Sequence, residues 1–196
     1  MIMTYQVVTT GEPEWFTLEN HRPEGAIGPK TEASMRYIPG TGFEAVMRCY
    51  EKDPKTTYTQ QDDPVFKDSC MEIFLDCYPE LPEYGYLNVE INSAGAMRCR
   101  FGPDRQNRIF LLEKGIPCPE VTVTKTEDNW QIHVIFPEKM LELLYERPCA
   151  FAPGHEMRGN FYKCGDETDT PHWTSWMQMR RLDFHDPACF GVLEIQ

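Results

Sequence analysis

Cys70-Met71-Glu72-Ile73-Phe74-Leu75-Asp76-Cys77 and Tyr86-Leu87-Asn88-Val89-Glu90-Ile91-Asn92 are the two stretches that decide the fold. Both alternate apolar and polar side chains, and a period of two places neighbouring residues on opposite faces of a β-strand. The turn signal at residues 93–95 leads into Met97-Arg98-Cys99-Arg100-Phe101, which continues the alternation. We therefore predict adjoining antiparallel strands with one dry face and one polar face. The polar face would carry Glu72, Asn88, Glu90, Asn92, Arg98 and Arg100.

Other parts of the chain show the same period. Strand character is found at residues 5–9, 33–38, 42–50, 121–124, 130–136 and 190–195. One short helix is predicted at residues 137–144, because a proline opens it and Leu and Met recur at helical spacing. About ten short strands with few helices predict an all-β antiparallel β-sandwich, of jelly-roll or immunoglobulin-like type, with one short helix. No linker divides the chain, so residues 1–196 are predicted to form a single domain.

Composition narrows the function. The 196 residues are 41% hydrophobic and 12% aromatic, which indicates a folded chain with a substantial core. No apolar run approaches the length of a membrane span. The net charge of −12 argues against nucleic acid and against an anionic membrane surface as partners.

The first residues and the cysteines bear on the cellular compartment. Met1-Ile2-Met3-Thr4 has neither the basic nor the apolar region of a secretory signal, so we expect a cytoplasmic protein; a signal removed earlier would make it a secreted one. The eight cysteines show no Cys-x-x-Cys spacing, and several fall inside strand patterns. We expect them to be mostly reduced thiols.

The polar face of the central strands is the first candidate site. Its carboxylates, amides and guanidiniums offer the mixture of donors and acceptors that sugar hydroxyls need. The alternative is a solvated sheet face with ion pairs between Glu90 and Arg98 or Arg100. Trp173 and Trp176 lie in a polar loop, where an exposed ring can stack on a sugar, although one of them could instead cover the end of the sandwich. Trp130 is in phase with apolar neighbours and is expected in the core.

Other kinds of chemistry have weaker support. The chain has no Gly-x-Ser-x-Gly motif, no glycine-rich phosphate loop and no His-x-x-x-His pair, so nucleophilic, nucleotide and zinc sites are disfavoured. Calcium stays open as a cofactor, because Asp62-Asp63 and the segment from Asp166 to Asp169 are acidic. Neither matches an EF-hand, and solvated charge is the alternative.

Four segments carry a family resemblance. Residues 65–76 resemble the signature of family 9 carbohydrate-binding modules, in which an aromatic residue precedes Asp-Ser-x-x-Glu-Ile-Phe-x-Asp. Residues 159–168, residues 173–176 and the segment from Asp183 to Gly191 resemble the standalone carbohydrate-binding family 9-like proteins. The similarity extends from about Ala33 to Ile195, and the Asp-Ser-x-x-Glu strand is shared with the broader DOMON-like superfamily.

The resemblance implies a β-sandwich that clamps a terminal sugar of an oligosaccharide or polysaccharide between two aromatic rings, in the service of carbohydrate catabolism. By position, the resemblance implies that Phe66 is the first clamp residue, where characterised modules have Trp. It also implies that Glu72 forms hydrogen bonds with sugar hydroxyls. Arg98 is a basic sugar contact, and Trp173 or Trp176 is the second clamp residue, with a preference for Trp176. Asn88 and Asn92 would orient the sugar, and structural calcium is common in the family.

The leading hypothesis is thus a carbohydrate-binding protein without catalytic activity. A second is a glycoside-active enzyme that pairs Glu72 or Glu90 with another carboxylate. A third is a haem-binding domain of DOMON type, since some relatives hold haem between Met and His, and the chain has ten Met and five His. Residues 163–166 (Lys-Cys-Gly-Asp) are explained by none of the three.

Overall fold

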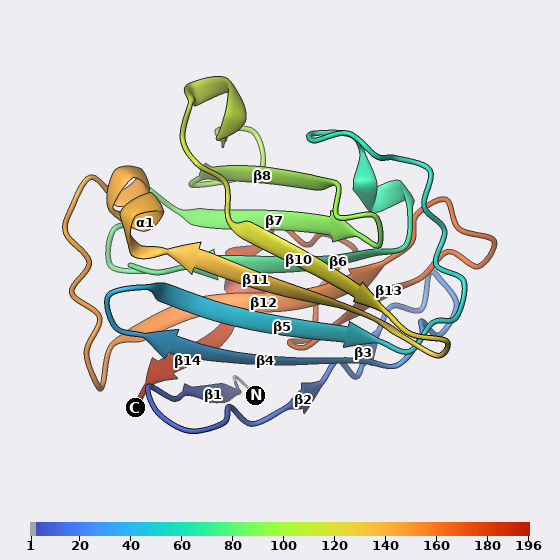
Figure 1. The fold of residues 1–196 in the computed structure, drawn as a ribbon, viewed down its shortest axis with the longest axis horizontal. Coiled ribbons are helices and arrows are strands. Elements are labelled where there is room, and N and C mark those ends of the chain that lie inside the picture. Colours follow the sequence, from blue (N-terminus) through green and yellow to red (C-terminus); the bar gives the residue numbers. More distant parts are fainter. Residues whose placement is uncertain (1–2) are drawn as a thin grey trace.

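Two β-sheets pack face to face in the computed structural model, which describes residues 3–196 (Figure 1). The nine-stranded sheet has the order β1-β14-β12-β6-β7-β8-β9, with β13 beside β12 and β3 beside β13. Its strands are β1 (Thr4–Val7), β3 (Asn20–His21), β6 (Cys70–Asp76), β7 (Tyr86–Asn92), β8 (Met97–Gly102), β9 (Ile109–Phe110), β12 (Glu156–Cys164), β13 (Trp173–Ser175) and β14 (Gly191–Ile195).

The five-stranded sheet has the order β10-β11-β5-β4-β2. Its strands are β2 (Phe16–Thr17), β4 (Thr31–Ile38), β5 (Gly42–Cys49), β10 (Glu120–Lys125) and β11 (Trp130–Pro137). Among the strand pairs of the described residues, only β1 with β14 is parallel. The predicted antiparallel sandwich is confirmed, with this one parallel edge as an addition.

The main core lies between the two sheets. Trp130 and Phe136 of β11 pack there with Ile73 of β6, and all three are buried. The prediction that Trp130 is a core residue is therefore confirmed. The predicted helix is α1 (Glu138–Tyr145), which buries Met140, Leu141, Leu144 and Tyr145. No helix in residues 3–196 has the length and apolarity needed to cross a bilayer.

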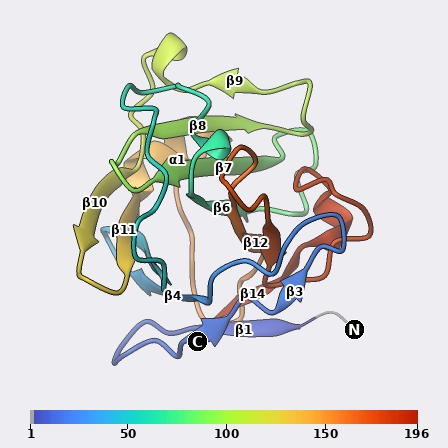
Figure 2. The ribbon, with the colours of Figure 1, turned by 90° about the vertical axis from the view of Figure 1, so that its right-hand side faces the viewer.

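The outer face of the nine-stranded sheet is also covered, which the alternating pattern did not predict. In Figure 2, the orange and red segments after β12 lie on the side of β6 and β12 that faces away from β10 and β11. At one end of this face, Phe74, Tyr86 and Tyr162 form a second apolar cluster with Met179 and Phe190. The polar face predicted to be outward is thus buried beneath loops, and Asn88, Asn92 and Glu72 are almost inaccessible.

Strand β12 is the main element that the pattern missed. It lies between β14 and β6, near the middle of the sheet, and seven of its nine residues are buried. Because both faces are covered, polar and apolar residues do not alternate along it. Three short 3₁₀-helices occupy the long loops: η1 (Val65–Lys67), η2 (Leu112–Lys114) and η3 (Pro187–Cys189). All eight cysteines are free thiols in the structure.

Candidate functional site

A cavity of about 420 Å³ lies on the covered outer face of the nine-stranded sheet. Strands β6, β7, β8 and β12 form its floor, and the walls come from η1, β13 and the loops around residues 105–108, 166 and 182–185. This volume falls within the range of pockets that hold small molecules. The lining residues are Phe66, Glu72, Glu90, Arg98, Arg100, Arg105, Arg108, Cys164, Asp166, Trp173, Leu182, Asp183, Phe184 and His185.

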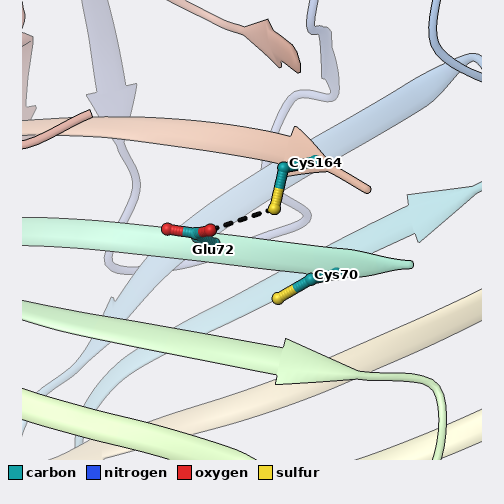
Figure 3. A group of neighbouring side chains, drawn as sticks. All are labelled: Cys70, Glu72 and Cys164. Carbon is teal, nitrogen blue, oxygen red and sulfur yellow. Dashed lines mark hydrogen bonds between the residues drawn. The ribbon is translucent and has the colours of Figure 1, made fainter. Parts of the chain in front are cut away.

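Glu72 on β6 is the buried carboxyl group at the centre of the floor. Its side chain meets the thiol of Cys164 on β12, which donates a hydrogen bond to Glu72 Oε1 over 3.1 Å (Figure 3). Burial, with Cys164 and Glu90 beside it, raises the pKa of Glu72 well above its usual value. The pKa of the Cys164 thiol is also well raised, first by Cys70 and then by burial. These shifts favour the protonated form of both groups, and a protonated Glu72 can donate as well as accept a hydrogen bond.

Glu90 on β7 lies directly across from Glu72 in the strand register. Asn88 Nδ2 donates to Glu90 Oε1 over 2.9 Å, whereas Glu90 Oε2 is buried without a partner. Burial raises the pKa of Glu90, and the nearby Arg98 and Arg100 oppose that rise. The floor therefore offers two carboxyl groups in different environments.

Four arginines bring positive charge to the cavity. Arg98 and Arg100 project from β8, with their guanidinium carbons 5.2 Å from the ring centre of Phe66 and 3.9 Å from that of Phe110. Arg108 donates to Asn88 Oδ1 over 2.5 Å and to the carbonyl of Arg105. Stacking and hydrogen bonds thus fix three of the guanidiniums before any ligand arrives.

Three aromatic rings line the walls. Phe66 comes from η1, Trp173 from β13, and Phe184 stacks on Tyr162 with ring centres 4.1 Å apart. Trp173 Nε1 donates to Asp166 Oδ1 over 2.7 Å, and burial raises the pKa of that carboxyl. Aromatic faces beside buried hydrogen-bonding groups suit a ligand that has both C–H surfaces and hydroxyls.

His185 forms part of the same wall. Its Nδ1 is 2.9 Å from the hydroxyl of Tyr86, which fixes the ring. Burial and then the four arginines lower the pKa of His185 to about 3. The imidazole is therefore neutral at physiological pH and can take part in hydrogen bonds as either donor or acceptor.

The comparison with protein families now decides the classification. The model of carbohydrate-binding family 9 matches residues 43–195. The chain belongs to this family. No curated protein matched the chain.

Solved structures share the fold of this family 9 chain. A candidate carbohydrate-binding protein from Bacteroides uniformis is 20% identical, with a TM-score of 0.80 and full coverage of both chains. A family 9 module from Caldicellulosiruptor kristjanssonii, in complex with cellotriose, is 9% identical with a TM-score of 0.73, covering 99% of this chain and 94% of the module. A glucose complex, also of a family 9 module from that organism, is 11% identical with a TM-score of 0.71 and covers 99% of this chain and 96% of the module. At these identities the similarities establish the fold.

The family 9 cavity brings together four of the seven site residues predicted from the sequence. Phe66, Glu72, Arg98 and Trp173 all line it, although they come from four different elements. Asn88 and Asn92 do not line it. The amide of Asn88 forms hydrogen bonds with Glu90 and with Arg108, so it fixes the positions of two residues that do line the cavity.

Asn92 positions a loop. Its amide donates to Asp68 Oδ2 over 3.0 Å and to the carbonyl of Tyr58. The same Asp68 oxygen accepts the backbone N–H groups of Thr57 and Tyr58. These bonds fasten the segment that leads into η1, and hence the position of Phe66.

The preference for Trp176 as the second clamp residue is wrong about its location. Trp176 is only 4% exposed and belongs to the main core, where its ring centre is 5.1 Å from that of Phe16. A Cβ atom on Gly191 would lie 2.5 Å from the Trp176 ring, which shows how closely the ring packs on that strand. Trp173 is the tryptophan in the cavity, and Trp176 closes one end of the sandwich.

Several lining residues escaped the sequence analysis as site residues. Glu90 and Arg100 belong to the polar face predicted as the first candidate site, and Glu90 to the enzymatic alternative, but neither was among the seven predicted ligand-binding residues. Phe184 and His185 lie in a segment quoted only for the family resemblance. Arg105 and Arg108 lie in an irregular loop, and no sequence signal identifies them.

The unexplained segment at residues 163–166 has a structural role through its lysine. Lys163 is fully buried and faces the space between the sheets. Its Nζ donates to the carbonyl of Cys164 over 2.9 Å and to His172 Nε2 over 2.8 Å, and it lies 3.8 Å from Glu51 Oε2. These contacts tie the loop before β13 to the end of β5.

The calcium sites suggested by the acidic loops gain no support from their side chains. Asp166 bonds Trp173, Asp63 Oδ2 accepts the backbone N–H of Gln60, and Glu167 pairs with Lys67. Among residues 3–196, only Cys70, Glu72 and Cys164 bring three metal-ligating side chains together (Figure 3). Two thiols suit a thiophilic cation rather than calcium. Calcium binding stays a prediction.

Proposed function

We propose that the chain is a carbohydrate-binding protein without catalytic activity, which holds a terminal sugar between Phe66 and Trp173. The observation that carries this proposal is one cavity that combines aromatic faces with fixed, buried hydrogen-bonding groups. The rings would pack on the C–H faces of the sugar, as apolar and aromatic surfaces do elsewhere in proteins. Glu72, Glu90 and His185 would read its hydroxyls.

The structural neighbours support the proposal. The two modules from Caldicellulosiruptor kristjanssonii are complexes with cellotriose and with glucose. Glucose and cellotriose are therefore the first ligands to test. Loops border the cavity, and a terminal sugar unit, whose chain continues in one direction only, needs a single gap between them where an internal unit needs two.

Isothermal titration calorimetry with glucose and cellotriose tests the proposal. Phe66→Ala and Trp173→Ala should each weaken binding by about tenfold, the ratio that 1.4 kcal/mol produces. Trp15→Ala is the matched control, because Trp15 is exposed, stacks on Arg48 and does not line the cavity. Absence of binding to every sugar, or full affinity in both cavity variants, would contradict the proposal.

Cellotriose reduced with borohydride tests which part of the sugar is read. Reduction opens the ring at one end of the chain and leaves the other rings intact. Loss of binding would assign the cavity to the reducing end, whereas retained binding would assign it to the other end. Binding that survives reduction and grows with chain length beyond three units would refute recognition of an end.

One observation favours glycoside hydrolysis as a second candidate. Glu72 and Glu90 are cross-strand neighbours whose pKa values are raised by different surroundings, and two carboxyl groups in different environments are what glycosidases use. Incubating cellotriose or a chromogenic glucoside with the protein tests it. Turnover that disappears in Glu72→Gln would establish this function, and no turnover would leave binding alone.

A further inference from the structure

Two guanidinium groups in the cavity have donors that the protein does not use. Arg98 Nε and Arg100 Nη1 are buried without a hydrogen-bond partner among residues 3–196. The same two guanidiniums approach a carboxylate only through other nitrogens: Arg98 Nη1 lies 3.9 Å from Glu90 Oε2, and Arg100 Nη2 lies 3.9 Å from Asp62 Oδ1, both beyond hydrogen-bond distance. A buried N–H group without an acceptor lowers the stability of the fold. We therefore expect a ligand to supply the missing acceptors.

Other arginines of the chain show the contrast. Arg22, Arg180 and Arg181 each bond a carboxylate side chain directly, and Arg36 does so although its Nε is also buried without a partner. Arg98 and Arg100 are held instead by the rings of Phe66 and Phe110, which fix their planes and leave the N–H edges free of protein acceptors. The side chain of Arg100 is only 4% exposed.

The charge of the cavity points the same way. Four guanidiniums line it, against four carboxyl groups. Burial raises the pKa of three of these carboxyl groups, those of Glu72, Glu90 and Asp166, which disfavours their negative charge beside the four cations, in a chain whose net charge is −12. After burial, the four arginines also lower the pKa of His185, which agrees with a positive potential at that wall.

A guanidinium only donates hydrogen bonds, and its planar fork fits a carboxylate with two parallel bonds. A sugar hydroxyl is a poorer match, because it brings a proton that needs its own acceptor. His185 and Asp166, which come from loops rather than from β8, can serve hydroxyls, whereas Glu90 lies beside Arg98 in the strand register. The cavity is thus divided into a wall for an anion and walls for a polyol.

We propose that the sugar taken by this cavity carries a carboxylate, a uronic acid unit, whose anionic group is bound by Arg98 and Arg100. The inference rests on the proposed carbohydrate-binding function and specifies its substrate class. The carboxylate would accept the unused N–H groups, and the sugar ring would lie against Phe66 and Trp173.

Calorimetry with matched pairs tests it: glucose against glucuronate, and galactose against galacturonate. A uronate should bind at least about tenfold more tightly than its neutral partner at low salt, which corresponds to about 1.4 kcal/mol. The preference should shrink only slightly at about 0.5 M salt, because salt screens partly buried charges much less than exposed ones. Equal affinity within both pairs, or a preference for the neutral sugars, would overturn the inference and leave the proposed function standing.

Arg98→Gln and Arg100→Gln connect the preference to these side chains. Each should remove most of the uronate advantage, measured as the ratio of uronate affinity to neutral-sugar affinity within the same variant. Arg147→Gln is the control, because that arginine lies over Tyr78, outside the cavity. Thermal melts show whether each variant is folded, and the less buried Arg98 provides the test if Arg100→Gln does not fold. An unchanged preference in folded Arg98→Gln would overturn the assignment, and failure of every sugar to bind would refute the proposed function itself.

Discussion

Replacing Lys163 by Met should destabilise the domain by about 3–5 kcal/mol, the cost of breaking a buried ion pair by removing one partner. Methionine retains most of the apolar stem and removes only the charged group. That group is fully buried and serves the carbonyl of Cys164, His172 Nε2 and the carboxylate of Glu51. Each buried acceptor left without a donor adds a cost of about 1–3 kcal/mol. A loss of this size is a large part of the roughly 5–15 kcal/mol that stabilises a typical domain.

The ionisation of Glu51 makes the stability lost in Lys163→Met depend on pH. Burial alone would raise its pKa, but Lys163, with hydrogen bonds from Ser69 and Trp130, lowers it overall. A carboxyl group whose folded pKa lies below its unfolded value stabilises the fold above that unfolded value. The contribution disappears as the pH falls through the folded pKa. The difference between wild type and Lys163→Met should therefore be largest near neutral pH and smaller below about pH 4.

Urea unfolding followed by tryptophan fluorescence measures both quantities. Lys139→Met, an exposed lysine on α1, is the control and should change stability by less than about 0.5 kcal/mol. The double variant Lys163→Met/Glu51→Gln should recover part of the loss, since it removes the unpaired charge. A loss below about 1 kcal/mol in Lys163→Met, or a loss that does not depend on pH, would refute the reasoning.

Three further predictions concern Trp176, Asp76 and calcium. Trp176→Ala should lower stability by about 3–5 kcal/mol in a denaturation curve and leave the sugar affinity of the folded fraction unchanged, so a selective loss of affinity would return Trp176 to the site. Burial raises the pKa of Asp76 from 3.8 to about 7, so its ionisation costs stability increasingly between these two pH values and fully above about 7; Asp76→Asn should therefore raise the melting temperature at about pH 8 and have little effect near pH 4. Calcium binding predicts a higher melting temperature with calcium than with a chelator, and identical melts would exclude a stabilising calcium site.

The central strands could be predicted because their residues alternate in type. The pattern at residues 70–77 and 86–92 placed Glu72 and Glu90 on one face, and the register puts them directly opposite each other. The pattern could not show that this face is covered, because the covering loops come from residues 165–190, far away in the sequence. The alternation within a strand is the same whether its polar face is exposed to solvent or covered by loops.

Strand β12 and the two tryptophans show the other limit. β12 carries Asn160, whose amide bonds the backbone at Met177 and Cys189, and Lys163, which faces inward to a polar network. Each polar group is satisfied by a distant partner, so its burial cannot be read locally. Trp173 and Trp176 lie three residues apart across the end of β13, and only the pairing of that strand with β12 decides which ring enters the cavity.

The covered outer face explains how the site is held ready for a ligand. Three strands each carry an aromatic residue at one end of this face and a cavity-lining polar group further along. The pairs are Phe74 and Glu72 on β6, Tyr86 and Glu90 on β7, and Tyr162 and Cys164 on β12. The aromatic end anchors the loop that supplies Phe184 and His185, through stacking on Tyr162 and the hydroxyl of Tyr86. A ligand therefore pays little for ordering that loop, and more of its contact energy remains as affinity. Because the wall is already ordered, the unused donors of Arg98 and Arg100 are where a ligand has the most to gain.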